Sequence, residues 1–261
     1  MTTALSKVNA GKQIGILIAA LIGFALAGVA VYNNLSAEGH AAYNSSNLGL
    51  FWTFPIVVYD YFLLTSTGLT MVATLAIILG GEDFRPIIRR AMWLALAGLA
   101  GGVAVLMLEL GHPLRAFATI PTSFAFTSPL YCNVICIVLY VLSLLALLAR
   151  TMQAGWSLAA VRGNAILSLV LALAVTAIAG VVYGSQSFRP FWASGDIPVG
   201  FIFESLLGGM AFIYFFSYLA YTFKASDMPQ GLRRLFNDRL PALFALVIFI
   251  QVLFVLARLT N

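Results

Sequence analysis

Residues 163–183 read GNAILSLVLALAVTAIAGVVY, an apolar run that contains no charged side chain. A transmembrane helix needs roughly 20 predominantly apolar residues, and this run is long enough to be one. Six further stretches are also long and predominantly apolar: 13–33, 54–80, 88–110, 129–149, 198–223 and 240–258. None shows the alternation of a strand, and helices satisfy every backbone hydrogen bond inside lipid. The sequence therefore predicts an all-α integral membrane protein, a bundle of about seven transmembrane helices.

The composition points to the same class. Of the 261 residues, 62% are hydrophobic and 9% are charged, and the mean hydropathy is +0.99. A soluble domain carries about 25% charged residues, so this chain has too little polar surface for water. Because the apolar runs occupy most of the chain, we expect one transmembrane domain over residues 1–261. The first run exceeds the roughly 7–15 apolar residues of a signal peptide, so we expect it to be retained.

Basic side chains fall mainly on one side of the membrane. The side with the N-terminus holds Lys7, Lys12, Arg85, Arg89, Arg90, Arg150, Arg162, Lys224, Arg233, Arg234 and Arg239. The other side holds Arg115, Arg189 and Arg258. The positive-inside rule then predicts a cytoplasmic N-terminus and an external C-terminus, in a multi-pass protein of the bacterial inner membrane. The net charge of +5 is thus a topology signal, and we expect a lipid bilayer and no nucleic acid as the partner.

The usage of histidine, lysine and cysteine argues against several cofactors. His40 and His112 do not supply the pair of axial ligands that a membrane haem b needs at membrane depth. Every lysine lies outside the apolar runs, so no retinal Schiff base is expected. Cys132 and Cys136 are too few for an iron–sulfur or zinc site and are interpreted as small core residues. We expect no haem and no metal ion in this chain.

Three acidic residues lie within apolar runs, where an unpaired charge is costly: Asp60, Glu109 and Glu204. The directions of the helices place all three in the external half of the bilayer. The same side is expected to hold His112, Arg115, Arg189, Tyr59, Tyr61, Tyr131 and Tyr183. Two plainer interpretations stay open. Glu109 and Arg115 would pair as a structural contact, and the tyrosines would form the aromatic belt of the membrane interface.

Such a cluster suits a proton-coupled substrate at the membrane edge, such as a quinone headgroup. Quinol oxidation releases two protons with two electrons, so its site needs hydrogen-bonding groups at both oxygens and bases that pass protons to water. We therefore predict Asp60, Glu109 and His112 as the catalytic proton carriers. The predicted quinone-binding residues are Tyr59, Asp60, Glu109, His112, Tyr131 and Tyr183.

Four short motifs occur in order along the chain: ELGHPLRA at 109–116, TSP at 127–129, RPFW at 189–192 and SLLGG at 205–209. Together they resemble the NrfD-like family over about residues 50–225. That family supplies the membrane subunit of polysulfide reductase and of related molybdenum enzymes. The DMSO reductase membrane anchor family is similar as well, through a Gly-x-Pro loop followed by a Thr-Ser element.

The resemblance implies a subunit that exchanges electrons between membrane quinone, such as menaquinone, and a docked four-cluster ferredoxin-like iron–sulfur subunit. That partner serves a molybdopterin catalytic subunit in anaerobic respiration, so the iron–sulfur clusters and the molybdopterin belong to the partner subunits. The resemblance also implies a quinone pocket in the outer half of a four-helix bundle, here about 54–183, with Tyr59 and Asp60 where the family places polar quinone ligands. Arg115, Arg189 and Trp192 are the candidates for partner docking.

The sequence departs from that family in two respects. Seven helices are expected where eight or more are usual. A tyrosine that the family carries in the middle of the fifth helix is absent, with Ile178 nearby and Tyr183 a turn later.

Two other classes of membrane protein stay open. A small-molecule or ion transporter needs polar residues near the bilayer midplane. The main ones here are Thr67, Thr70, Thr74 and Thr176. A purely structural anchor has no use for Asp60 within the bilayer.

Overall fold

The computed structural model describes residues 10–43, 54–110, 118, 121–122, 124–187 and 193–259, and these contain helices but no strand. The long helices are α1 (Ala10–Glu38), α2 (Phe54–Ile78), α3 (Arg85–Glu109), α5 (Pro129–Met152), α6 (Leu158–Gly184), α7 (Ile197–Ala220) and α9 (Leu240–Leu259). The short ones are η1 (Gly39–Ala42), η3 (Glu82–Phe84), η4 (Ala225–Asp227), α8 (Gln230–Arg234) and η5 (Leu235–Arg239). Within the described residues, seven helices are long and apolar enough to cross a membrane. This confirms the predicted fold class and the expected number of spans.

Local sequence signals set where the helices begin. Proline occupies the first turn of α3, α5 and α7, where its missing amide hydrogen costs no intrahelical bond. At the start of α5, the Ser128 side chain accepts a hydrogen bond from the Tyr131 amide. Ser157 accepts one from the Ala160 amide at the start of α6. Such N-caps pair backbone donors that would otherwise have no partner.

Several predicted helix starts were too late in the chain, and the two largest differences are in the fifth and last spans. The fifth span was predicted from residue 163, but the Ser157 cap starts α6 at Leu158, so Arg162 is helical. The last span was predicted from residue 240, but α8, the π-helical η5 and α9 form one apolar stretch over Gln230–Leu259. In both cases a basic side chain interrupts the apolar pattern without ending the helix.

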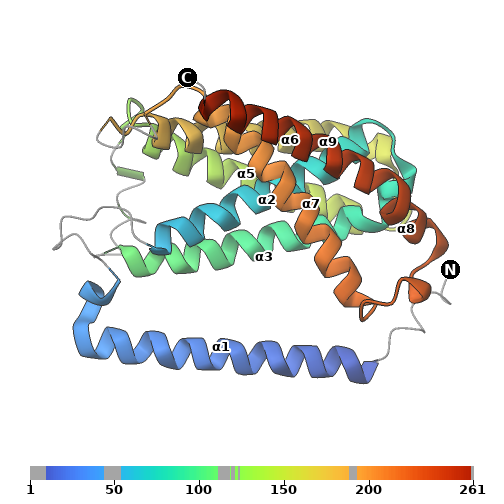
Figure 1. The fold of residues 1–261 in the computed structure, drawn as a ribbon, viewed down its shortest axis with the longest axis horizontal. Helices are drawn as coiled ribbons and strands as arrows, with labels where there is room; N and C mark the ends of the chain where they lie inside the picture. Colours follow the sequence, from blue (N-terminus) through green and yellow to red (C-terminus); the bar gives the residue numbers. More distant parts are fainter. Residues whose placement is uncertain are drawn as a thin grey trace.

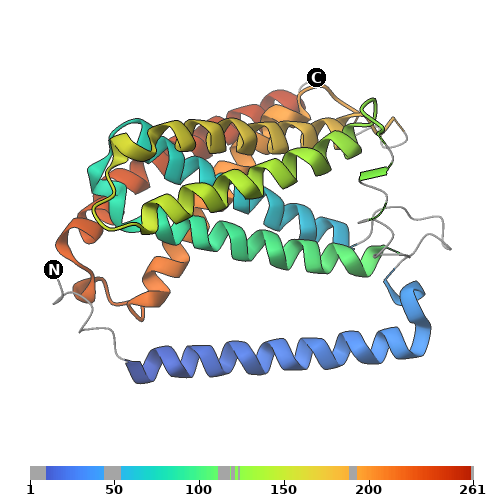
Figure 2. The ribbon, with the colours of Figure 1, turned by 180° about the vertical axis from the view of Figure 1, so that it is seen from behind.

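α2 is the central helix of the bundle, and it contacts α3, α6 and α7 (Figure 1). In its most apolar stretch 67% of the residues are buried, against 0% for α1. Figure 2 shows from behind that α5 lies beside α6, and that α1 lies apart from the other helices. The buried residues of α2 include the hydroxyl side chains Thr65, Ser66, Thr67, Thr70 and Thr74. The centre of the bundle therefore carries a row of buried hydroxyl groups.

Glycine lets α2 and α7 cross in backbone contact. A Cβ atom on Gly68 would lie 1.6 Å from the Ser205 carbonyl oxygen, and one on Gly209 would lie 2.3 Å from the Gly68 carbonyl carbon. A similar contact joins α3 to α2, because a Cβ on Gly102 would lie 2.9 Å from the Phe62 Cβ. Small residues of this kind allow close packing of helices in membranes.

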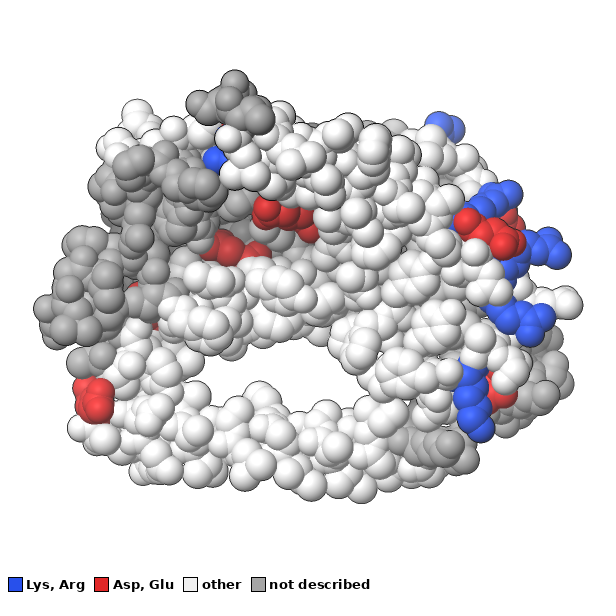
Figure 3. Space-filling model, viewed as in Figure 1, with Lys and Arg blue, Asp and Glu red and all other residues white. Residues whose placement is uncertain are grey.

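Most of the basic residues lie at one end of the bundle. Figure 3 shows most of the lysines and arginines of the visible face gathered there, around the turns that join α2 to α3 and α7 to α9, with a smaller blue area near the other end. The described basic residues near this end, which we call the basic end, are Arg85, Arg89, Arg90, Arg150, Arg162, Lys224, Arg233, Arg234 and Arg239. The opposite end holds the starts of α2, α5 and α7 and the last residues of α3, α6 and α9.

Candidate functional site

A hydrogen bond joins α2 to α6 near the opposite end. The Tyr183 hydroxyl donates to the Asp60 carboxylate Oδ2, and both side chains are partly buried. The tyrosine ring also contacts Phe201 of α7, with ring centroids 5.4 Å apart. Three helices thus surround the one acidic residue of α2. Two of the predicted quinone-binding residues are brought together here.

A second polar contact fixes the register of the same two helices. Thr176 donates to Thr67 Oγ1 at 2.8 Å, and both side chains are fully buried. Thr67 follows Asp60 by seven residues, or two helical turns, and Thr176 precedes Tyr183 by the same number. α2 and α6 are therefore antiparallel neighbours with polar pairs repeating along one seam.

The third polar contact comes from α5. The fully buried Tyr140 places its hydroxyl 2.9 Å from Ser66 Oγ and 2.7 Å from Thr70 Oγ1. It also donates to the Ser66 carbonyl oxygen at 3.1 Å. A buried phenol with several partners fixes how α5 sits against α2, because moving it would leave polar atoms without partners.

The other predicted tyrosines have different surroundings. Tyr59 is partly buried against the core, and its backbone lies close to Gly102 of α3. Tyr61 is 53% exposed and meets Phe62 and Phe212 edge to face, so it points away from the Asp60–Tyr183 contact. Tyr131 lies in the first turn of α5, with its ring 5.5 Å from that of Phe126. Its predicted role at a quinone stays a prediction.

Of the remaining predicted site residues, only Glu109 is among the described residues. Glu109 is the last residue of α3, at the same end as Asp60, and is partly buried. His112, Arg115, Arg189 and Trp192 lie outside the described residues.

Glu204 lies on the surface of α7. It is exposed, whereas its neighbour Ser205 is fully buried against α2. Figure 3 shows acidic side chains in a hollow of this face, away from the basic end. Among the packed helices α2 to α9, the described acidic residues near the opposite end are Asp60, Glu109, Asp196 and Glu204. Carboxylates in this region can thus be reached from the surface.

Arg258 belongs to an ion pair that the sequence did not indicate. Its Nε lies 2.9 Å from Asp196 Oδ2, which joins the end of α9 to the start of α7. Its charge also acts on Glu204. The basic residue that broke the charge pattern at the C-terminus is therefore part of a charged group across two helices.

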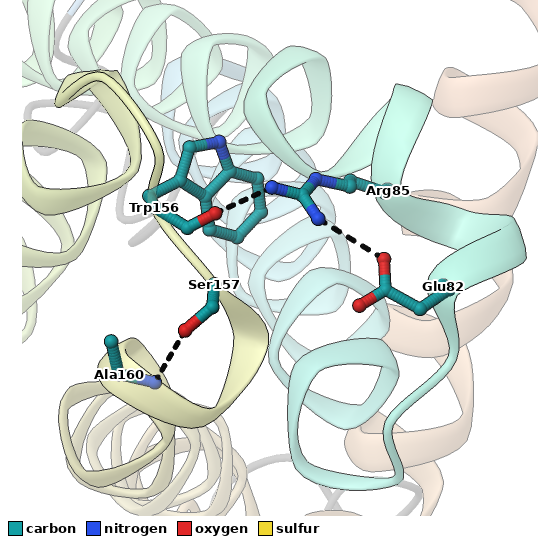
Figure 4. Close-up of polar contacts among 5 residues, drawn as sticks. All are labelled: Glu82, Arg85, Trp156, Ser157 and Ala160. Atoms are coloured by element: carbon teal, nitrogen blue, oxygen red, sulfur yellow. Dashed lines mark hydrogen bonds and ion pairs between the residues drawn. The ribbon is translucent and has the colours of Figure 1, made fainter.

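At the basic end, arginines of α3 hold the turn between α5 and α6 (Figure 4). Arg85 pairs with Glu82 at 3.2 Å, donates to the Trp156 carbonyl at 2.5 Å, and lies over the Trp156 ring at 4.4 Å. Arg89 donates to the Thr151 carbonyl and approaches the same ring at 5.5 Å. These contacts join the turn before α3 to the turn between α5 and α6, so we interpret them as structural.

The two cysteines are less buried than the sequence predicted. Both are partly buried free thiols, and the Cys132 thiol donates to the Phe126 carbonyl at 3.2 Å. Cys132 lies in the first turns of α5, beside the exposed Phe126, so it is not a core residue. Cys136 lies one turn later and packs against the hydrophobic core, as expected.

Sequence reasoning missed Asn133. This residue of α5 is 5% exposed, and its Oδ1 has no hydrogen-bond partner among the described residues. An asparagine inside an apolar run is a signal that the sequence does contain, since a buried amide needs partners.

The fold and the site together define a class: a multi-pass helical membrane protein whose polar residues gather between α2, α5 and α6, with an acidic residue near one end. The model of the NrfD family, described as polysulphide reductase, NrfD, matches residues 43–261. The chain therefore belongs to the NrfD family, whose members are membrane subunits of oxidoreductase complexes, as the motifs indicated. α1 precedes the matched region. A comparison with curated proteins finds no match.

Proposed function

We propose that this chain is the quinone-reactive membrane subunit of its oxidoreductase complex. The observation that carries the proposal is the contact between Asp60 and Tyr183. An acidic side chain in a membrane helix is costly and is a functional candidate by default. Here the carboxylate is held by a tyrosine of another helix, near the end of the bundle, where a lipid-soluble headgroup meets water.

The two side chains have distinct tasks at a quinol. The Asp60 carboxylate accepts a proton from a quinol hydroxyl as the electrons leave. The Tyr183 hydroxyl holds the carboxylate in one orientation, and it can also bind a quinone oxygen, because a phenol both donates and accepts. We propose Glu109, at the end of α3, and His112, three residues later in the sequence, as the next proton acceptors.

The proposed site can be reached by a quinone from the lipid, and it has a defined side of the membrane. Glu204 is an exposed carboxylate of α7 near this end. We propose that a headgroup entering from lipid meets it before it reaches Asp60. The positive-inside rule puts the basic end in the cytoplasm. The proposed quinone site then lies on the external side, in a bacterial inner membrane.

The electrons that leave the quinol need an acceptor. We propose a docked four-cluster ferredoxin-like iron–sulfur subunit, which in turn serves a molybdopterin catalytic subunit. Arg115, Arg189 and Trp192 are the proposed docking residues. Menaquinone is the proposed quinone.

The experiment starts from mild-detergent purification through a tag on this chain. Iron, molybdenum and quinone are assayed in what co-purifies, and menaquinol-dependent turnover is compared for the wild type, Asp60→Asn and Asp227→Asn. Asp227 is a carboxylate near the basic end, in η4, and its variant is the matched control. We expect Asp60→Asn to retain both metals and lose turnover, while the control is unaffected. Unchanged turnover in Asp60→Asn would contradict the site, and a metal-free chain that purifies alone would favour a transporter.

A further inference from the structure

We propose that Asn133 is a further residue of the quinone site and hydrogen-bonds the headgroup from α5. This inference rests on the proposed function. Asn133 is buried, at 5% exposure, and its Oδ1 accepts no hydrogen bond from any described residue. A buried amide oxygen without a partner is rare in folded proteins, because it loses its hydrogen bond to water and gains none in return.

Helix geometry places Asn133 on the same face of α5 as Tyr140. The two are seven residues apart, which is two turns of an α-helix. Tyr140 faces α2, because its hydroxyl meets Ser66 and Thr70. Asn133 therefore faces the same way, two turns closer to the opposite end, which is the end where Asp60 lies.

Two contacts measure the depth of Asn133 independently. α2 and α5 run in the same direction, and Tyr140 of α5 contacts Ser66 of α2. Asn133 precedes Tyr140 by seven residues and Tyr59 precedes Ser66 by seven, so Asn133 lies at the depth of Tyr59. α5 and α6 run in opposite directions, and Arg150 donates to Asn164 at 2.5 Å near the basic end. Asn133 precedes Arg150 by as many residues as Val181 follows Asn164, so Asn133 and Val181 lie at the same depth. Val181 is within one helical turn of Tyr183. Both measures bring Asn133 to the depth of the Asp60–Tyr183 contact.

Two other buried side chains, Ser168 and Ser217, have an oxygen without a partner among the described residues. The further unpaired atoms, on Arg89, Arg90 and Gln251, belong to side chains that are only partly buried. However, a serine hydroxyl in a helix rotates to reach the carbonyl of the preceding turn. An asparagine oxygen needs a donor, and the amide hydrogens of the helix interior are already used. Of Asn133, Ser168 and Ser217, only Asn133 therefore needs a hydrogen-bond donor from outside its own helix.

An amide suits a headgroup that changes its redox state. The quinone form offers two carbonyl acceptors, and the quinol form offers two hydroxyl donors. The Asn133 Nδ2 donates to the first, and the Oδ1 accepts from the second after a half-turn of the amide. Together with Asp60 and Tyr183, this residue gives the site hydrogen-bonding groups from three helices.

The test uses the purified complex in nanodiscs and menaquinone-4 as the probe. Two readouts are taken: the dissociation constant, and the infrared carbonyl stretching band of the bound probe. The variant is Asn133→Leu, and the control is Asn164→Leu, the same change near the basic end. We expect Asn133→Leu to weaken binding about tenfold and to shift the carbonyl band toward its position in apolar solvent. The control should alter neither readout.

Stability gives a further readout that a purely structural role would not produce. Because leucine replaces an amide with an unpaired oxygen, the quinone-free Asn133→Leu protein should melt at an unchanged or higher temperature. Asn133→Thr, which keeps a hydroxyl, is the second variant and should weaken binding about threefold. Melting at a lower temperature with unchanged probe binding would overturn the inference and show a structural role.

The outcomes separate the two proposals. If wild type and Asn133→Leu bind menaquinone-4 equally with the same carbonyl band, while Asp60→Asn loses turnover, the inference is wrong and the proposed function stands. If the wild type binds no menaquinone-4, the proposed function fails and the role of Asn133 fails with it.

Discussion

Thr176 on α6 donates a hydrogen bond to Thr67 on α2 at 2.8 Å, two helical turns from the contact between Tyr183 and Asp60. The interface between these helices therefore has a buried pair of threonine hydroxyls near its middle and the Tyr183–Asp60 hydrogen bond toward one end. The threonine pair fixes the register of the two helices, and this register brings Tyr183 next to Asp60. This arrangement leads to the first two predictions.

Removal of the Tyr183 hydroxyl should impair quinol chemistry. A hydrogen bond to a charged group contributes about 1.5–3 kcal/mol, so Tyr183→Phe should lower menaquinol-dependent turnover roughly 10- to 100-fold. The measurement is the steady-state rate in purified complex. Tyr61→Phe is the control, because Tyr61 is exposed on the same end of α2 and should keep its full rate. Equal rates in both variants would mean that the contact serves only packing.

Thr67 and Thr176 should contribute to the free energy of unfolding with a small coupling energy between them. Hydrogen bonds between membrane helices contribute about 0.6 kcal/mol on average. A double-mutant cycle of Thr67→Val and Thr176→Val should therefore give a coupling energy near this value, measured by unfolding in detergent. A coupling energy of zero would show that the two hydroxyls do not depend on one another.

Close packing at the crossing of α2 and α7 should make Gly209 intolerant of substitution. Its Cβ would lie 2.3 Å from the Gly68 carbonyl carbon, so Gly209→Ala forces the helices apart. We expect a loss of about 1–3 kcal/mol of stability, visible as a lower melting temperature. Gly101→Ala is the control, because nothing lies within 4 Å of a Cβ there. Similar melting of both variants would rule out a tight crossing.

Trp156 should stabilise the basic end. Its ring lies 4.4 Å from the Arg85 guanidinium and 5.5 Å from that of Arg89. Each such cation–π contact contributes about 0.5–1 kcal/mol when exposed, so Trp156→Leu should cost about 1–2 kcal/mol in the same melting assay. Trp93→Leu removes an exposed tryptophan of α3 and should have little effect.

The orientation in the membrane can be checked directly. With the basic end in the cytoplasm, green fluorescent protein fused before residue 1 should fluoresce, and alkaline phosphatase fused after residue 261 should be active. The reverse pattern would put the Asp60–Tyr183 contact on the cytoplasmic side. The proposed external quinone site would then be wrong.

Much of the fold could be predicted from the sequence because the bilayer limits the choices. An apolar run of about 20 residues inside lipid has to be a helix. The seven spans followed from this rule, and the errors fell at helix ends. At Leu158 and Gln230 a cap or a continuing helix extends past the apolar pattern. The family also followed from four short motifs, and its model matches residues 43–261.

The site could be predicted only in part. Asp60 and Tyr183 were both singled out, because charges and tyrosines at membrane depth are conspicuous in an apolar sequence. Their contact was not, because residues on different helices meet only through packing. Asn133 and the Asp196–Arg258 pair were missed for the same reason, since their significance depends on what surrounds them.

The sequence by itself determined that this chain crosses a membrane with seven helices, because hydrophobicity is a local property that each run carries alone. Only the tertiary structure decided which helix faces meet. α2 became the centre because Gly68, Gly102 and Gly209 allow close approach of backbones. The hydroxyls of Thr67 and Tyr140 then found partners on α6 and α2, and these contacts put Asp60, Tyr183 and Asn133 at one depth.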